Sequence, residues 1–428
     1  MFWEYIFGVF VLFGFNFIFW FAVGGLRLLD DVLFRKHPVK YFDVSRGKKK
    51  QKQFLKPRQV AVIIPAYNEE LVIADTIKSL LPIVLRKNIF VNTYGSSDRT
   101  AEIATRYKVN VLNDKTAGKT KAEKLSNTVK ILNEKYNYKA VLFVDADTRI
   151  SRDFLVRGLP YFSDPDVVAV AGYATTLWDR KNASFWSMFY VSYRERMYFF
   201  MQVIVKYAQT WRNTNVSPII PGFASIYRID ILPQIDINPK GLVIEDFNMT
   251  FEVHHKKLGK IAHHRSVFAT TQDPDNFKDY VQQISRWDLG FWQTVRRHGF
   301  WASAFSASLI FYIIDVMFGS IVFIFLPLIF FVGFTPILIP SILHITWFLS
   351  MYNFIHSIIN VKAIFIGVFI IDYTMTFIVA FAQKRVEYFL FGFGFLFLRY
   401  VDSLLYVLML PKAYLVTSTG RWKSPTRR

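Results

Sequence analysis

Long apolar segments at both ends of the chain place the strongest constraint on its fold. The first runs from Tyr5 to Leu26 without a charged residue. A helix that crosses a bilayer needs roughly 20 predominantly apolar residues. A cleaved signal peptide is the alternative, but this segment is longer than a signal-peptide core and no small-residue cleavage motif ends it. We therefore expect a retained transmembrane helix within residues 1–30.

The C-terminal third of the chain predicts about four more transmembrane helices, within residues 303–412. The last segment contains Arg399 and Asp402, and charges inside a bilayer usually pair or face a cavity. Part of that segment lying at the membrane surface is the alternative, so the number of crossings stays open by one or two. The four segments are Ala304–Phe331, Ile337–Ile359, Ala363–Ala382 and Phe389–Leu410.

The charge distribution predicts the orientation of this multi-pass membrane protein. The net charge is +20, and basic residues are concentrated in a linker, residues 31–59, and in a tail, residues 413–428. Positive segments next to transmembrane helices stay in the cytosol. Lys384 and Arg385 would face outward, against this rule. We expect the catalytic domain and the C-terminus to be cytosolic, in contact with membrane lipids, and no nucleic-acid partner, because the charge follows the membrane topology.

Residues 60–275 predict a soluble α/β domain with a mostly parallel, Rossmann-like sheet. Apolar runs such as "VAVIIP" and "AVLFV" alternate with segments of helical spacing. Ligands of such sheets bind at the carboxyl ends of the strands. The polar motifs "PAYNE", "GSSD" and "DAD" all follow predicted strands, which indicates one shared site.

Asp145 and Asp147 directly follow a buried-type strand. Two carboxylates at positions i and i+2 point the same way from an extended chain, which suits one cation that binds a phosphate. A strand end with a turn-forming Asp is the alternative.

The motifs "PAYNEE", "GSSDRTAEIA", "DAD", "VIEDFNMT" and "QQISRW" occur in this order. Together they resemble an inverting family-2 glycosyltransferase with the GT-A fold. The flanking apolar helices make the chain similar to the membrane-embedded synthases of cellulose, hyaluronan and poly-N-acetylglucosamine. The resemblance covers residues 60–300 well and the membrane part only by its layout.

The resemblance implies a nucleotide-sugar donor, expected to be UDP-linked, and a Mg²⁺ or Mn²⁺ cofactor. Asp147 would be the direct metal ligand, with Asp145 on the ribose or on the metal through water. The other donor-binding residues would be Ala66, Tyr67, Glu69, Asp98, Lys119 and Arg286, with Lys121 as an alternative to Lys119.

The resemblance also assigns acid–base and acceptor roles. Asp246, beside Glu245, would be the catalytic base, although Ile244 replaces the threonine of the family's T-E-D motif. A helix N-terminus is the alternative explanation for these acids. Within an interfacial helix over residues 276–302, "QISRW" would place Gln283 and Trp287 at the acceptor. An ordinary amphipathic helix is the alternative there. Gly222 and Phe223 complete the predicted acceptor site.

One pair of residues departs from the family's pattern, and two pairs of histidines suggest a different kind of site. Thr93 and Tyr94 stand where relatives carry two acids, which leaves the nucleotide open. The pairs His254/His255 and His263/His264 suggest a metal site, but adjacent side chains on a strand or helix point apart, so we expect surface residues.

The sequence supports three functions in decreasing order. The first is a processive polysaccharide synthase coupled to export of the chain. The second is a single-transfer enzyme acting on a lipid or polyprenyl-phosphate acceptor, and the third is a transporter or scaffold with an inactive transferase domain. The joint presence of Asp145, Asp147, Asp246 and Arg286 disfavours the third. The sequence does not indicate an oligomeric state.

Overall fold

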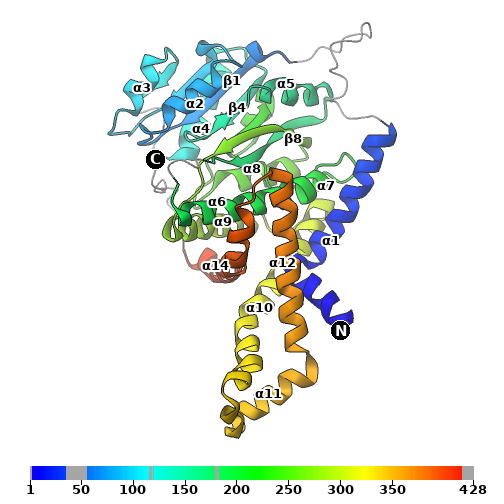
Figure 1. The fold of residues 1–428 in the computed structure, drawn as a ribbon. Helices are drawn as coiled ribbons and strands as arrows, with labels where there is room; N and C mark the ends of the chain where they lie inside the picture. Colours follow the sequence, from blue (N-terminus) through cyan, green and yellow to red (C-terminus); the bar gives the residue numbers. More distant parts are fainter. Residues whose placement is uncertain (1, 35–54, 115–117, 119, 179–182, 417–428) are drawn as a thin grey trace. The chain divides into compact units, whose positions relative to one another are not determined.

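The fold combines an eight-stranded mixed sheet with long apolar helices (Figure 1). The computed structural model describes residues 2–34, 55–114, 118, 120–178 and 183–416, and the side chains from residue 14 onward. Most of the predicted basic linker and of the basic tail lies outside the described residues. Two compact units are present: Met1–Trp20 with Ser308–Pro411, and Phe21–Ala307 with Lys412–Arg428.

The sheet has the order β3-β2-β1-β4-β7-β6-β8-β5. Its first four strands are parallel, as predicted, whereas β7 runs antiparallel to both of its neighbours, β4 and β6. β8 is parallel to β6 and antiparallel to β5. The strands are β1 Val60–Pro65, β2 Ile89–Asn92, β3 Asn110–Leu112, β4 Ala140–Val144, β5 Arg149–Ile150, β6 Val167–Thr176, β7 Ala224–Arg228 and β8 Lys260–Thr271.

Helices cover both faces of this sheet (Figure 1). Val62 and Ile64 of β1 enter one apolar cluster and Ala61 and Ile63 enter the other, which explains why the strand is apolar at successive positions. The helices of this unit are α2 Ile73–Leu80, α3 Thr100–Arg106, α4 Lys121–Lys135, α5 Phe154–Gly158, α6 Phe185–Phe200, α7 Tyr207–Gln209, α8 Glu245–His255 and α9 Phe277–His298, with the short turns η2 Pro57–Gln59, η3 Arg86–Asn88, η5 Leu159–Ser163 and η7 Ile229–Gln234.

The carboxyl ends of β2, β1 and β4 meet at one edge, as the sequence predicts. The Ala66 N–H donates to the Asn92 carbonyl at 2.9 Å, and the Thr76 hydroxyl donates to the Ala146 carbonyl at 2.6 Å. Because β7 is antiparallel to β4, the segment that enters β7 also lies at this edge, with Ala224 opposite Val144.

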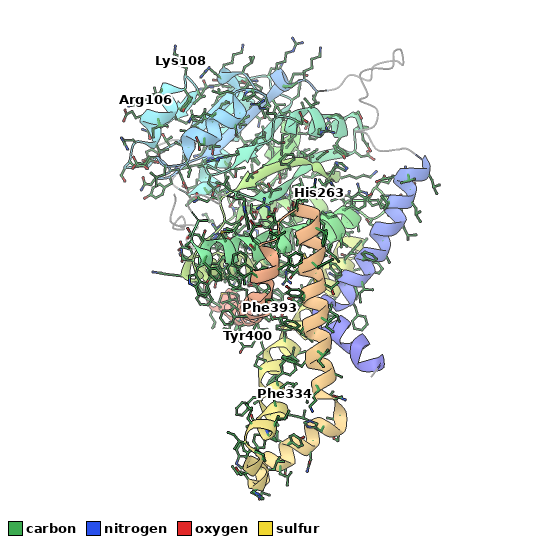
Figure 2. All side chains as sticks on the ribbon, viewed as in Figure 1. Arg106, Lys108, His263, Phe334, Phe393 and Tyr400 are labelled. Carbon is green, nitrogen blue, oxygen red and sulfur yellow. The ribbon has the colours of Figure 1, made fainter. Side chains whose placement is uncertain are left out.

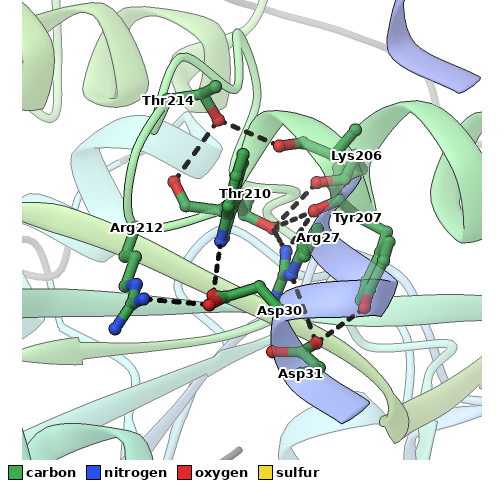
Figure 3. A network of polar contacts seen from close by, with 10 residues as sticks. Arg27, Asp30, Asp31, Lys206, Tyr207, Thr210, Arg212 and Thr214 are labelled. Carbon is green, nitrogen blue, oxygen red and sulfur yellow. Dashed lines mark hydrogen bonds and ion pairs between the residues drawn. The ribbon is translucent and has the colours of Figure 1, made fainter. Parts of the chain in front are cut away.

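A π-helical segment, η6 Met201–Lys206, joins α6 to α7. The last turns of α1 (Phe2–Phe34) bind Tyr207 of α7 and the residues that follow α7 (Figure 3). Arg27 donates to the Tyr207 carbonyl and to Thr210 Oγ1 at 3.0 Å, and its guanidinium lies 4.0 Å from the Tyr207 ring centroid. The Tyr207 hydroxyl donates to Asp31 at 2.6 Å. Asp30 accepts from Trp211 at 3.2 Å and from Arg212 at 3.1 Å.

The expectation that His263 is a surface residue is wrong. His263 on β8 (labelled in Figure 2) is 1% exposed. Its ring stacks on the buried Tyr173 of β6 at 6.1 Å, and its Nδ1 lies 3.0 Å from the Ala171 carbonyl oxygen of the same strand. Burial lowers the pKa of His263, so it is a neutral core residue. The aromatic and basic mixture of α6 is typical of a lipid surface, but its Arg194 and Arg196 are both buried.

The helical unit contains three helices that are long and apolar enough to cross a membrane among the described residues: Ala304–Leu338, Val361–Gln383 and Tyr388–Leu415. The predicted crossing at Ile337–Ile359 is wrong, because this segment breaks at a 3₁₀ turn. The helix that remains would be about 20 Å long, too short for a hydrocarbon core of about 30 Å. The elements are α10 Ala304–Leu338, η8 Pro340–His344, α11 Thr346–Ile358, α12 Val361–Gln383, α13 Tyr388–Phe391, η9 Gly392–Gly394 and α14 Phe395–Leu415.

Helix α1 is interrupted at Gly14, which has a φ of 70°. The break leaves backbone N–H groups without helical partners, and such groups are costly in an apolar environment. Asp315 of α10 accepts from the N–H groups of Phe15 at 2.8 Å and Asn16 at 3.1 Å. The one carboxylate therefore caps the second part of α1.

Candidate active site

The loops after β1 and β2 are tied together by side chains. Asp98 accepts from the backbone N–H of Glu70 at 3.0 Å and from Thr100. The Ser97 N–H donates to Asn68 Oδ1 at 2.8 Å, and the Glu69 N–H donates to Thr100 Oγ1 at 2.8 Å. Asp98, a predicted donor ligand, therefore braces the two loops that would surround a nucleotide.

The "PAYNE" loop contacts a buried cation on α4. Lys124 donates to the carbonyl of Ala66, and its Nζ lies 5.5 Å from the centroid of the exposed Tyr67 ring. Burial lowers the pKa of Lys124 to about 8, and the nearby charge of Glu69 acts in the opposite direction. The loop thus combines the exposed ring of Tyr67 with the buried, opposite charges of Lys124 and Glu69.

The "DAD" loop follows β4 as predicted. The backbone N–H of Asp145 donates to the Phe223 carbonyl at 3.0 Å, which fixes the predicted acceptor loop beside it. Asp147 is partly buried and accepts a 3.4 Å hydrogen bond from Thr148.

Lys121, at the start of α4, lies between carboxylates from two elements. Its Nζ is 2.8 Å from Asp145 Oδ1 and 3.0 Å from Glu245 Oε1. Burial acts to lower the pKa of Lys121, but the charges of Asp145, Glu245 and Asp246 outweigh it and raise that pKa above its ordinary value. The capping box of Thr120 and Glu123 starts α4 here and sets this geometry. Lys119 lies outside the described residues, and Lys121, the predicted alternative, lies among these carboxylates.

Asp246 lies in the first turn of α8, as the helix N-terminus explanation predicted. Its Oδ1 accepts from the Phe247 N–H at 2.9 Å and its Oδ2 from the Gly222 N–H at 3.2 Å. Burial raises the pKa of Asp246 to about 6 and the charge of Glu245 adds to this, while Lys121 and the two N–H groups oppose it. A carboxylate with such a pKa can accept a proton near neutral pH.

Gly222 lies directly beside this carboxylate cluster. A Cβ at Gly222 would lie 3.3 Å from Lys121 Nζ, 3.5 Å from Glu245 Oε1 and 3.7 Å from Asp246 Cβ. Even a methyl group would therefore contact the charged groups, so the glycine lets the backbone lie close to them, and its role at the acceptor stays a prediction.

Helix α9 carries the "QISRW" motif and braces α8. Gln293 accepts from the Val243 N–H at 3.0 Å, and Gly290 packs on Ile244, where a Cβ would come within 2.9 Å. Gln283 and Trp287 both contact Arg194 of α6, with Gln283 Oε1 2.8 Å from Nη2 and the Trp287 ring 4.1 Å from Cζ. Arg286 is partly buried on the same helix.

The two atypical residues after β2 have different environments. Thr93 is fully buried, and its hydroxyl has no hydrogen-bond partner among the described residues, whereas Tyr94 is partly exposed. Tyr94 therefore offers the only accessible side chain of the pair at the sheet edge.

Sequence reasoning missed several buried polar residues around the site. Arg194 and Asp273 form a buried ion pair at 3.4 Å, and burial raises the pKa of Asp273 to about 6, with a further contribution from Asp147. Burial lowers the pKa of Lys206 to about 8, and the charge of Asp246 partly opposes this shift. For Arg194, the available signal in the sequence was a charged residue within the aromatic segment of α6.

Comparison with known structures finds distant similarities. A mannosyltransferase from Pyrobaculum calidifontis, solved with GDP-Man and Mn²⁺, is 13% identical with a TM-score of 0.44, over 92% of this chain and 99% of that chain. Glucosyl-3-phosphoglycerate synthase from Mycobacterium tuberculosis, solved with Mn²⁺, UDP and phosphoglyceric acid, is 15% identical with a TM-score of 0.38, over 57% of this chain and 80% of that chain. A search of curated proteins finds no match.

A family model decides the classification. The model described as "Glycosyltransferase like family 2" matches residues 57–290, which is more than half of the chain and includes every strand and loop of the site described above. The protein therefore belongs to glycosyltransferase family 2 and is a glycosyltransferase with a GT-A domain.

Proposed function

We propose that this glycosyltransferase moves a hexose from a UDP-linked donor, such as UDP-N-acetylglucosamine or UDP-glucose, to a growing polysaccharide that is exported through the membrane. The observation that carries the reaction type is the carboxylate cluster around Lys121 at the carboxyl end of β4. In this cluster, groups that suit a metal-bound diphosphate lie beside a carboxylate that suits proton transfer.

The residues present fit a divalent cation held partly by the substrate. No cluster of three or more metal-ligating side chains occurs among the described residues. Mg²⁺ commonly binds through one or two carboxylates together with substrate phosphates, and Asp147 and Asp145 offer that set. When bound, the cation would stabilise the charge on the departing diphosphate as a Lewis acid. Lys121, already beside Asp145, supplies a fixed positive charge to the same region.

Asp246 is the proposed general base. The acceptor hydroxyl oxygen attacks the anomeric carbon as the bond from that carbon to the diphosphate oxygen breaks, which inverts the configuration. The hydroxyl proton passes to the Asp246 carboxylate, and the nucleoside diphosphate leaves with the bonding electrons. The raised pKa of Asp246, about 6, supports this role, because it makes the carboxylate a stronger base than an ordinary aspartate.

A polysaccharide acceptor is supported by two features. The transferase domain is part of a chain with three helices able to cross a membrane among its described residues. The Q-x-x-R-W residues Gln283 and Trp287 belong to a buried network rather than to a free amphipathic surface, which suits a fixed aromatic platform for a sugar ring. A single transfer to a lipid or polyprenyl-phosphate acceptor is the second candidate, favoured by the same apolar helices.

A donor panel tests the reaction. Protein purified in detergent is incubated with Mn²⁺ and a set of UDP- and GDP-sugars, and nucleoside diphosphate release and product size are measured. Release with one UDP-hexose and a polymeric product is the expected result. A single added sugar on an extracted lipid would establish the second candidate, and no release from any donor would refute both.

Two further measurements test the residues. Asp246→Asn should lower turnover by about 10²–10⁴-fold, the usual contribution of a general base, while donor binding is kept. Asp236→Asn is the matched control, since that carboxylate is 41% exposed and pairs with Arg297 away from the cluster. Asp147→Asn should instead weaken Mn²⁺-dependent binding of UDP, measured by calorimetry.

A further inference from the structure

Arg194 is a buried cation for which the proposed reaction gives no role. It lies on α6, and its side chain is fully inaccessible to solvent. Burying a charge costs free energy unless it is paired and hydrogen-bonded. Its partners should therefore show what it is for.

These partners come from α6 itself, from α9 and from the segment between β8 and α9. Arg194 Nη2 donates to Gln283 Oε1 at 2.8 Å and lies 3.0 Å from the Tyr198 hydroxyl. Arg194 Nε lies 3.4 Å from Asp273 Oδ1, which also accepts from Tyr198 at 2.9 Å. The guanidinium carbon lies 4.1 Å from the Trp287 ring centroid.

One planar group thus contacts two residues that lie a turn apart on α9. Gln283 and Trp287 have the i, i+4 spacing that places side chains on the same helix face. A guanidinium donates hydrogen bonds from its edge and stacks through its face. An N–H at the edge of Arg194 binds the Gln283 amide while its guanidinium carbon lies over the Trp287 ring, and Trp287 keeps part of its surface exposed.

The packing of α6 on α9 does not depend on this contact alone. Tyr280 of α9 is fully buried and stacks on Tyr190 of α6 at 5.9 Å, with Tyr193 of α6 at 6.2 Å. The helices have an aromatic contact of their own, so Arg194 is not required merely to hold them together.

We infer that Arg194 is a positioning residue that fixes Trp287 and Gln283 in the orientation that binds the terminal sugar ring of the acceptor. This inference rests on the proposed function. Arg194 acts through partners on α6, on α9 and before α9, whereas the donor cluster is built around Lys121 on α4. Loss of the Arg194 side chain should therefore weaken acceptor binding and leave donor binding largely unchanged.

The test compares three variants of the full-length protein. Arg194→Lys keeps the charge but loses the planar fork and the stacking face. Arg194→Met combined with Asp273→Asn removes both charges, so that no unpaired charge is left buried if the single change impairs folding. Tyr193→Leu is the matched control, because its ring contacts Tyr280 and Arg196 and its loss loosens the same helix pair at the neighbouring position.

Three quantities are measured for each variant. They are the Kd for UDP with Mn²⁺, the rate of donor hydrolysis without acceptor, and the KM for oligosaccharides obtained by partial hydrolysis of the wild-type product. Both Arg194 variants should raise the acceptor KM by about tenfold or more, and Arg194→Lys, which keeps the charge of Asp273 near Asp147 unchanged, should leave donor Kd and hydrolysis within about threefold of wild type. Tyr193→Leu should leave the acceptor KM within about threefold.

A double-mutant cycle gives the second readout. If Arg194 acts through Trp287 and Gln283, Arg194→Lys should raise the acceptor KM by a smaller factor in the Trp287→Leu background than in the wild type. Additive effects, an unchanged KM in the Arg194 variants, or equal losses of donor and acceptor binding would overturn the inference. Absence of any sugar transfer by the wild-type protein would instead overturn the proposed function and this inference with it.

Discussion

Lys121 Nζ lies 2.8 Å from Asp145 Oδ1, so the amino end of α4 is joined by charge to the carboxyl end of β4. The same ammonium lies 3.0 Å from Glu245, at the start of α8. Three elements that are far apart in the sequence therefore share one cation. The charge of Lys121 also opposes the rise in the pKa of Asp246 that burial and the charge of Glu245 cause.

Removing that cation should change the pH dependence of the enzyme. In Lys121→Met, Asp246 loses a charge that lowers its pKa, so the pKa rises above about 6. Since the base works when deprotonated, the acidic limb of kcat/KM should move to higher pH, and activity at a fixed acidic pH should fall as the limb moves. The measurement is a pH–rate profile. Lys130→Met, an exposed change on α4, is the control. An acidic limb that stays in place in Lys121→Met would show that Lys121 does not control the base.

Asp246 should make the protein less stable as the pH rises. Its folded pKa, about 6, exceeds the ordinary aspartate value of 3.8, so the folded state binds more protons than the unfolded state between these values. Stability therefore falls as pH rises from about 4 to about 6. The gap between the folded and the unfolded pKa corresponds to roughly 3 kcal/mol at most. Asp246→Asn should thus unfold at a higher temperature than wild type at pH 7.5, with little difference at pH 4. The opposite order at pH 7.5 would contradict the raised pKa.

Gly222 should tolerate no large side chain without loss of activity. Its backbone φ is ordinary, so a substitution adds bulk without backbone strain, and the new Cβ points at Lys121, Glu245 and Asp246. We expect Gly222→Ala to lower kcat/KM by roughly tenfold and Gly222→Leu, which must displace part of the charged cluster, to abolish transfer. Full activity of Gly222→Leu would mean that transfer does not depend on the arrangement of this cluster beside Gly222.

The contact between α1 and α7 should stabilise the protein through a single arginine. Arg27 is 6% exposed and binds Tyr207, Thr210 and Asp31, so Arg27→Met should lower the free energy of unfolding by about 2 kcal/mol. Arg212→Met is the control, since Arg212 binds Asp30 with a side chain that is 45% exposed, and should cost less than about 1 kcal/mol. Thermal unfolding in detergent measures both. Equal effects of the two variants would show that burial of Arg27 is not what matters.

Local patterns account for the parts that were predicted correctly. The apolar runs of β1 and β4 identify parallel strands covered on both faces, and their polar ends meet at one edge for geometric reasons alone. The predicted crossing at Ile337–Ile359 failed because hydropathy counts apolar residues but does not detect the turn at Pro340. The expectation for His263 failed because strand alternation cannot tell which face is covered.

The sequence by itself determined the class of fold, the presence of helices able to span a membrane and the carboxylates Asp145, Asp147, Glu245 and Asp246 as candidates. These follow from hydropathy, strand–helix alternation and short motifs, which are local. Only the tertiary structure decided that Lys121 joins the cluster, that Asp246 is buried enough to have a raised pKa, and that Arg194 contacts both Gln283 and Trp287. Each of these depends on burial and on charges brought together from distant parts of the chain, and neither quantity is encoded in neighbouring residues.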